Sequence, residues 1–222
     1  MVDIGSVQGL AILFLQEGPT RGLIPAPFFI LRGSSELGAS AIQLLQLAVP
    51  NCELFATTSQ QHHKMITKQL GVDVVFDRSS PSLINDIKAA TRSSEGVDAI
   101  LEAVGAGSVE KHIFDAFAPK GPKRYAQVWT GGDEIRGPAG VDPVLFQSRD
   151  SLEIPGGKIF FVALQVLLAE GRYKPPLPLH KVGEELDSLK SGLDLMRKGV
   201  SGEKLVVLYK TSHQPSLPTH MR

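Results

Sequence analysis

The sequence predicts an α/β fold in which a doubly wound parallel sheet is covered by helices on both faces. Three observations support this prediction: short apolar runs recur along the chain, a segment with helical periodicity follows each run, and glycine or proline separates them. Strands that alternate with helices of this length imply right-handed crossovers and therefore a parallel sheet. At 222 residues the chain can bury one sizeable core.

The first strand is predicted at 28–31, a continuous apolar run of the kind that is buried on both faces. The apolar residues of 37–48 then fall on one face at helical spacing, and Pro50 ends this pattern. Before this unit, residues 5–16 predict a short linking helix, and the prolines around 25–27 predict a connector.

The same unit repeats along the chain. Further strands are predicted at 54–57, 72–76, 97–101 and 124–129, with helices at 60–70, from Ser80 to about Ala90, and from about 108 to 117. Gly71 is expected to stop the second helix, and Ser80 is expected to cap the third, with Pro81 in its first position.

Beyond 129 the alternation loosens. The glycine- and proline-rich stretch 131–143 predicts a loop, followed by helices at 157–170 and 184–198 and a last strand at 204–209. Four apolar side chains of the last helix share one face: Leu186, Leu189, Leu193 and Met196. We therefore expect extra helices and a strand at the C-terminal end of the sheet domain.

Charge and cysteine usage favour small-molecule partners in the cytoplasm. The 23 basic and 23 acidic side chains balance, so no net field attracts nucleic acid or an anionic membrane. The single cysteine, Cys52, cannot form an internal disulfide, and no apolar run reaches the ~20 residues that span a bilayer. We expect neither nucleic acid nor a membrane as partner.

The sharpest motif is Arg-Gly-Ser-Ser-Glu-Leu-Gly at 32–38, between the first predicted strand and the first predicted helix. A small-residue turn at Gly33 lets the backbone approach a diphosphate, which the N–H groups and dipole of the following helix stabilise. Two residues depart from the ideal pattern: Arg32 replaces the first glycine, and Glu36 brings a carboxylate near the phosphates. Glu36 can instead simply occupy the first helical turn, where the dipole favours it.

The motif and the alternation together predict a Rossmann-type dinucleotide-binding domain over 28–210. Residues 1–27 are predicted to form the linking helix and connector, and 211–222 a flexible tail. Cofactor choice is predicted from the second strand, which ends without the acid that binds the ribose of NAD. Because Ser59, Lys68 and Arg78 can surround a 2′-phosphate, NADP is favoured, although either cation alone could be surface charge.

Four stretches carry a resemblance to a known family: the turn and first helix at 30–44, the passage 68–77, and the closing segments 192–199 and 201–207. The resemblance is to the zinc-type alcohol dehydrogenase-like medium-chain dehydrogenases and reductases, especially fungal trans-acting enoyl reductases. It implies diphosphate contacts at Ser34, Ser35, Glu36 and Leu37, and contacts to the adenosine phosphate at Ser59 and Lys68. Arg78 stands where the family commonly has tyrosine, while Val128 and Trp129 correspond to the nicotinamide side. These residues and Gly33 form the expected cofactor site.

The resemblance also implies an N-terminal GroES-like domain, which this sequence does not include. We expect no metal site, because Cys52, His62 and His63 lack the spacing of metal ligands. Glu102 is a candidate acid or base at the end of the fourth strand, and His112, Trp129 and Asp133 could line the same crevice.

The leading hypothesis is an NADP(H)-dependent reductase of fungal-type secondary metabolism that acts on an enoyl or carbonyl substrate. By resemblance, a polyketide synthase could be its partner. Two alternatives stay open: a cofactor-free isomerase or cyclase that holds an apolar metabolite in the crevice, and a non-catalytic binding subunit. We also expect a homodimer, formed through surface that the family covers with its other domain.

Overall fold

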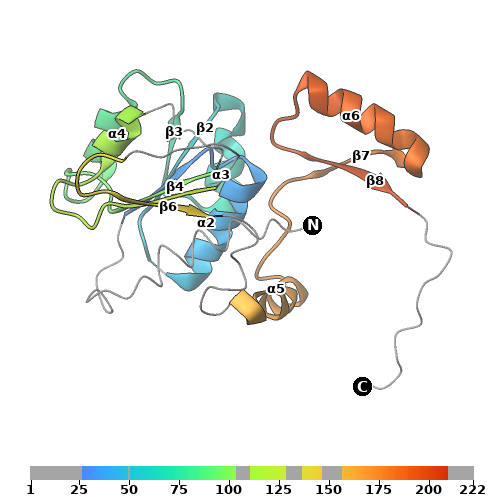
Figure 1. The fold of residues 1–222 in the computed structure, drawn as a ribbon, viewed down its shortest axis with the longest axis horizontal. Coiled ribbons are helices and arrows are strands. Elements are labelled where there is room, and N and C mark those ends of the chain that lie inside the picture. Colours follow the sequence, from blue (N-terminus) through green and yellow to red (C-terminus); the bar gives the residue numbers. More distant parts are fainter. Residues whose placement is uncertain (1–26, 50, 104–110, 129–136, 147–156, 210–222) are drawn as a thin grey trace. The chain divides into compact units, whose positions relative to one another are not determined.

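The computed structural model describes residues 27–49, 51–103, 111–128, 137–146 and 157–209 (Figure 1). The chain divides into two compact units, Met1–Pro176 and Leu177–Arg222. The outer domain boundaries expected from the sequence, at 27/28 and 210/211, adjoin residues outside the described ones and stay predictions.

The first unit is built on a six-stranded sheet in the order β3-β2-β1-β4-β5-β6, in which every neighbouring pair is parallel. The strands are β1 (Phe28–Leu31), β2 (Leu54–Thr58), β3 (Val74–Asp77), β4 (Ala99–Glu102), β5 (Arg124–Val128) and β6 (Asp142–Phe146). The strand order reverses beside β1, because β2 and β3 lie on one side of it and β4 to β6 on the other. This confirms the predicted doubly wound parallel sheet, and ligands of such sheets bind where the order reverses.

Helices cover both faces of this sheet. They are α2 (Glu36–Ala48), the 3-10 helix η1 (Gln60–His62) with α3 (His63–Leu70), α4 (Leu83–Ala90) and the 3-10 helix η3 (Lys111–Ala116). Later in the chain, the 3-10 helix η5 (Gly157–Ile159) leads into α5 (Phe160–Ala169). One core cluster joins Phe29 and Leu31 of β1 to Ile87 of α4 and Ile113 of η3. Side chains alternate along a strand, so the equally buried Phe28 and Ile30 point to the other face, where α2 packs on β1. Burial on both faces explains the continuous apolar run.

Most predicted elements are confirmed within two residues of their ends, but the start of α4 differs. Gly71 ends α3 in the left-handed conformation, at φ +66°, as predicted. The N-cap of α4 is Ser82 rather than Ser80. Ser80 is held in a turn after β3 by its N–H, which donates to the carbonyl of Asp77 at 3.1 Å. The helix therefore starts two residues later than the sequence suggested.

Part of the predicted loop 131–143 is wrong, because β6 begins at Asp142. Pro143 argued against a strand, since it has no N–H to donate. In the sheet, however, Pro143 pairs with Tyr125 of β5 on an edge strand, where a missing donor is tolerated.

The second unit is a β-α-β arrangement with two parallel strands. Its elements are β7 (Leu179–Glu184), the 3-10 helix η6 (Leu186–Ser188), α6 (Leu189–Lys198) and β8 (Lys204–Leu208). Strand β8 confirms the strand predicted at 204–209. Strand β7 was not predicted, and Glu184, which was expected to begin a helix, is its last residue. The apolar stripe of α6 is exposed, Leu193 by 45%.

A buried hydroxyl pair fastens the segment after α5 to α2. The Oγ of Ser40 and the Oη of Tyr173 lie 2.9 Å apart, and both side chains are buried. Nearby, the Gln43 amide donates to the carbonyl of Lys174 at 3.0 Å and accepts from its N–H at 3.1 Å. The segment is thus held to α2 by side-chain and backbone bonds together.

We expect Tyr173→Phe to lower the free energy of unfolding by about 1–3 kcal/mol, because it leaves the buried Ser40 hydroxyl without its partner. Urea unfolding of Ser40→Ala, of Tyr173→Phe and of the double variant Ser40→Ala/Tyr173→Phe measures the coupling free energy between the two hydroxyl groups. The double variant should lose less than the two single losses added together. Strictly additive losses would show that the pair contributes nothing.

Candidate functional site

The turn between β1 and α2 is tied to the carboxyl end of β2. The Gly33 N–H donates to the carbonyl oxygen of Thr57 at 2.8 Å, and the Arg32 N–H donates to the Oγ1 of Thr57 at 3.0 Å. The hydroxyl of Thr58 donates to the Oγ of Ser34 at 2.7 Å. This role of Thr57 and Thr58 was not predicted from the sequence, although two adjacent threonines at the end of a buried strand indicate hydroxyl groups at the carboxyl edge of the sheet.

Sterics require glycine at two positions of this turn. A Cβ on Gly38 would lie 2.6 Å from the carbonyl oxygen of Arg32, and a Cβ on Gly33 would lie 2.9 Å from the Cβ of Ala56. Arg32, which replaces the first glycine of the pattern, adopts the left-handed conformation at φ +57°. The turn therefore keeps the glycine-type geometry, and α2 starts directly against it.

The first turn of α2 presents its N–H groups at this edge of the sheet. Ser35 is the N-cap, and its hydroxyl accepts from the Gly38 N–H at 3.0 Å. Glu36 begins the helix and is half-buried, while Leu37 is buried in the core. Since the first helical N–H groups have no partners within the helix, this end attracts an anion. The geometry of the turn fits a diphosphate, and the Glu36 carboxylate is a charge that opposes it.

Two of the three residues expected at the 2′-phosphate lie at the same carboxyl edge of the sheet, after β2 and β3. Ser59 follows β2 directly, and the Arg78 N–H donates to the carbonyl of Thr58 at 3.0 Å, so both lie at the carboxyl ends of β2 and β3. Lys68 is exposed in the last turn of α3. Within the described residues, no hydrogen bond or ion pair joins Lys68 to Ser59 or Arg78.

Sequence reasoning missed a carboxylate at this edge, Asp77, which pairs with Thr58 in register. Two hydrogen bonds from Ser79, by its hydroxyl at 2.6 Å and its N–H at 2.9 Å, lower the pKa of Asp77 below its usual value. His63 and Arg78 lower this pKa further by their charge. The side chain is therefore an anion at neutral pH. Asp77 could not be found from the sequence because it belongs to β3, and only the register between β2 and β3 places it beside the end of β2.

The other candidates are dispersed. Val128 ends β5 and is half-buried, while Trp129 and Asp133 lie outside the described residues. Glu102 ends β4 and is 0% exposed, so its carboxylate is closed to solvent in this conformation. His112 is exposed on η3.

Across the described ranges, no three His, Cys, Asp or Glu side chains gather as a metal site would need. None of the described helices is both long and apolar enough to cross a membrane.

A family model described as zinc-binding dehydrogenase matches residues 37–151, about half of the chain. Among curated proteins, the trans-enoyl reductase tasC of Hapsidospora irregularis is 32% identical over 188 residues, which are 76% of this chain and 47% of that protein. The trans-enoyl reductase himH of Aspergillus japonicus is 26% identical over 180 residues, 79% of this chain and 50% of that protein. The chain thus spans about half the length of these relatives.

Solved structures agree on the fold. The ER cyclopropanase CurF from the curacin A biosynthetic pathway superposes with a TM-score of 0.71 at 19% identity, covering 94% of this chain and 61% of that one. The alcohol dehydrogenase TADH from Thermus sp. ATN1 gives 0.68 at 18% identity, over 93% and 57%. At such identities the likeness establishes the fold alone. With the match of the family model, the chain belongs to the zinc-binding dehydrogenase family, within the medium-chain dehydrogenases and reductases.

Proposed function

We propose that this chain forms the nucleotide-binding part of an NADP(H)-dependent reductase that acts on an enoyl or carbonyl compound of secondary metabolism. The observation that carries the proposal is the β1 turn. Two glycines without room for a Cβ and the N-terminus of α2 lie at the point where the strand order reverses. The names of the curated relatives, trans-enoyl reductases, support the reaction class. By the same resemblance, a polyketide synthase would supply the substrate.

Each part of the proposed site has a separate task. The first turn of α2 and Ser34 would bind the diphosphate through N–H and hydroxyl donors. Ser59, Lys68 and Arg78 would donate to the 2′-phosphate. Val128, at the end of β5, would line the nicotinamide half of the crevice, together with Trp129. A bound nicotinamide would supply the hydride, and Val128 and Trp129 would orient the nicotinamide ring.

Calorimetric titration of the purified chain with NADPH and with NADH tests the proposal. We expect saturable binding of one NADPH per chain and weaker binding of NADH. No heat at millimolar NADPH would overturn the proposal.

Glu36→Ser should strengthen NADPH binding, because it removes a carboxylate that opposes the diphosphate at the start of α2. A like-charge repulsion of about 1 kcal/mol at 4 Å in water corresponds to roughly fivefold in affinity. Glu95→Ser is the matched control, since Glu95 is an exposed residue at the amino edge of the sheet, before β4. Equal affinities for wild type and Glu36→Ser would mean that Glu36 points away from the phosphates.

We also propose that the chain forms a homodimer through α5. Three exposed apolar side chains follow helical spacing, Ile159 at the end of η5 and Val162 and Val166 on α5, and Val162 is 62% exposed. Monomers rarely keep such a patch in water. A second copy would bury it.

Light scattering at high protein concentration should therefore report a dimer, which Val162→Lys should dissociate. Gln165→Lys adds the same charge to another exposed position of α5 and should leave the dimer intact. A monodisperse wild-type monomer would contradict this proposal.

A further inference from the structure

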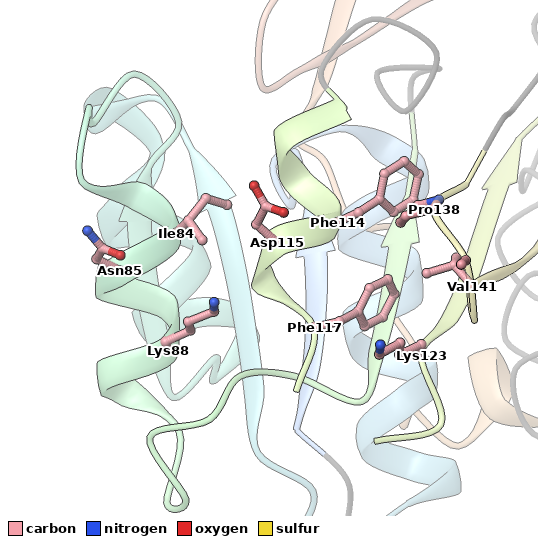
Figure 2. A pocket seen from close by; sticks show the side chains of 10 residues that line it. Ile84, Asn85, Lys88, Phe114, Asp115, Phe117, Lys123, Pro138 and Val141 are labelled. Atoms are coloured by element: carbon pink, nitrogen blue, oxygen red, sulfur yellow. The ribbon is translucent and has the colours of Figure 1, made fainter. Parts of the chain in front are cut away.

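A pocket of about 610 Å³ lies on the face of the sheet that α4 and η3 cover (Figure 2). Its apolar lining comes from three elements: Ile84 on α4, Phe114 and Phe117 at η3, and Val141 before β6. Phe114 and Phe117 belong to the core cluster, and Ile84 and Val141 pack against it. The floor of the pocket is therefore the outer surface of the packed core. Its volume suits one small molecule.

Two lysines give this pocket a positive charge. Lys88 enters from α4, and Lys123 enters from the turn before β5. Both side chains are half-buried, and neither makes a hydrogen bond or an ion pair to the described residues. A Cβ placed on Gly140 would lie 3.9 Å from the Lys123 Nζ, so this ammonium lies over the segment before β6. Asp115, which is exposed, contributes the one carboxylate of the lining.

The pocket is separate from the proposed cofactor crevice. Lys123 directly precedes β5 and Val141 directly precedes β6, so this end of the pocket lies at the amino edge of the parallel sheet. The turn at Gly33 follows β1 and lies at the carboxyl edge. A ligand of this pocket would therefore not occupy the diphosphate site.

We infer that this pocket binds a small amphipathic carboxylate, with its apolar body on Ile84, Phe117 and Val141 and its carboxylate between Lys88 and Lys123. A half-buried ammonium loses hydration without gaining a partner, and an anion restores that interaction through charge-assisted hydrogen bonds. Burial of an alkyl chain adds roughly fourfold in affinity for each CH₂ group that leaves water. The inference does not depend on the proposed reductase function.

Titration calorimetry of the full chain with octanoate tests the inference, with 1-octanol as the uncharged probe of equal length. We expect one saturable octanoate site and at least roughly tenfold weaker binding of 1-octanol. Lys88→Gln/Lys123→Gln should weaken octanoate binding to the level of 1-octanol. Lys64→Gln, a change at an exposed lysine of α3, should leave it unchanged, and Asp115→Asn should strengthen it by removing a repulsion.

A footprint on the wild-type protein keeps the test independent of how the variants fold. Octanoate should protect Lys88 and Lys123, but not Lys64, from acylation by an activated ester, as read by mass spectrometry. Saturating NADPH should leave the octanoate affinity unchanged. No saturable binding, an undiminished affinity in the double variant, or equal protection of all three lysines would each overturn the inference.

Discussion

Gly38→Ala should weaken NADPH binding, because the proposed diphosphate turn has no room for another side-chain atom at this position. The added Cβ would lie 2.6 Å from the carbonyl oxygen of Arg32 and 2.9 Å from the Cα of Gly33. Both neighbours are backbone atoms, so the turn and α2 must move apart. Overpacking of this kind costs about 1–3 kcal/mol. If this free energy is lost entirely from NADPH binding, the affinity for NADPH drops by roughly fivefold to 150-fold.

The sign of this effect is diagnostic, because alanine is otherwise preferred over glycine inside a helix by about 1 kcal/mol. Gly192→Ala is the matched control: in α6 the new Cβ would lie 3.8 Å from a methyl of Val182, at ordinary contact distance. We expect this variant to bind NADPH like the wild type and to unfold no more easily. Calorimetry measures the binding, and thermal unfolding followed by circular dichroism measures the stability.

If Gly38→Ala binds NADPH with wild-type affinity, the turn does not contact the cofactor, and the proposed site is wrong. A variant that melts earlier yet still binds NADPH when folded leads to the same conclusion. Only a loss of affinity in a folded variant supports the site. The titration is therefore done well below the melting temperature of the variant.

The sequence alone was sufficient for the core of the fold because local signals agree there. Strand β1 is apolar throughout since both its faces are covered, and Gly71 ends α3 where a left-handed residue is needed. Strand β7 carries no such signal. Its residues Leu-His-Lys-Val-Gly-Glu neither alternate nor form an apolar run, and most are exposed. Only the pairing with β8, more than 20 residues later, makes this segment a strand.

The candidate site also has one part that could be predicted from local sequence and another part that depends on contacts between strands. The turn at Gly33 could be predicted because its position between a strand and a helix is local information. The turn is attached to Thr57, and Asp77 lies beside Thr58, because β2 neighbours both β1 and β3. The spacing of residues along the chain does not show which strands are neighbours. Glu102 differs from both. Its position at the end of β4 suggested access to the crevice, but its side chain is buried.

Lys68→Glu should reverse the preference of the site for NADPH over NADH if Lys68 reaches the 2′-phosphate. The change removes an attraction of about 1 kcal/mol at 4 Å in water and adds a repulsion of similar size, which together amount to roughly 30-fold. NADH has no 2′-phosphate, so its affinity should stay the same. The ratio of the two dissociation constants, measured by calorimetry, is therefore the quantity that decides.

The structure also supplies the competing assignment. Lys64 lies one turn before Lys68 on the same face of α3, and it is closer along the chain to Ser59 and the carboxyl edge of β2. Lys64→Glu is thus the informative comparison, and Lys190→Glu on the exposed side of α6 is the control for charge alone. A ratio that changes only in Lys64→Glu would move the phosphate contact one turn along the helix. A ratio unchanged in both would remove α3 from the 2′-phosphate site and leave Ser59 and Arg78 as its donors.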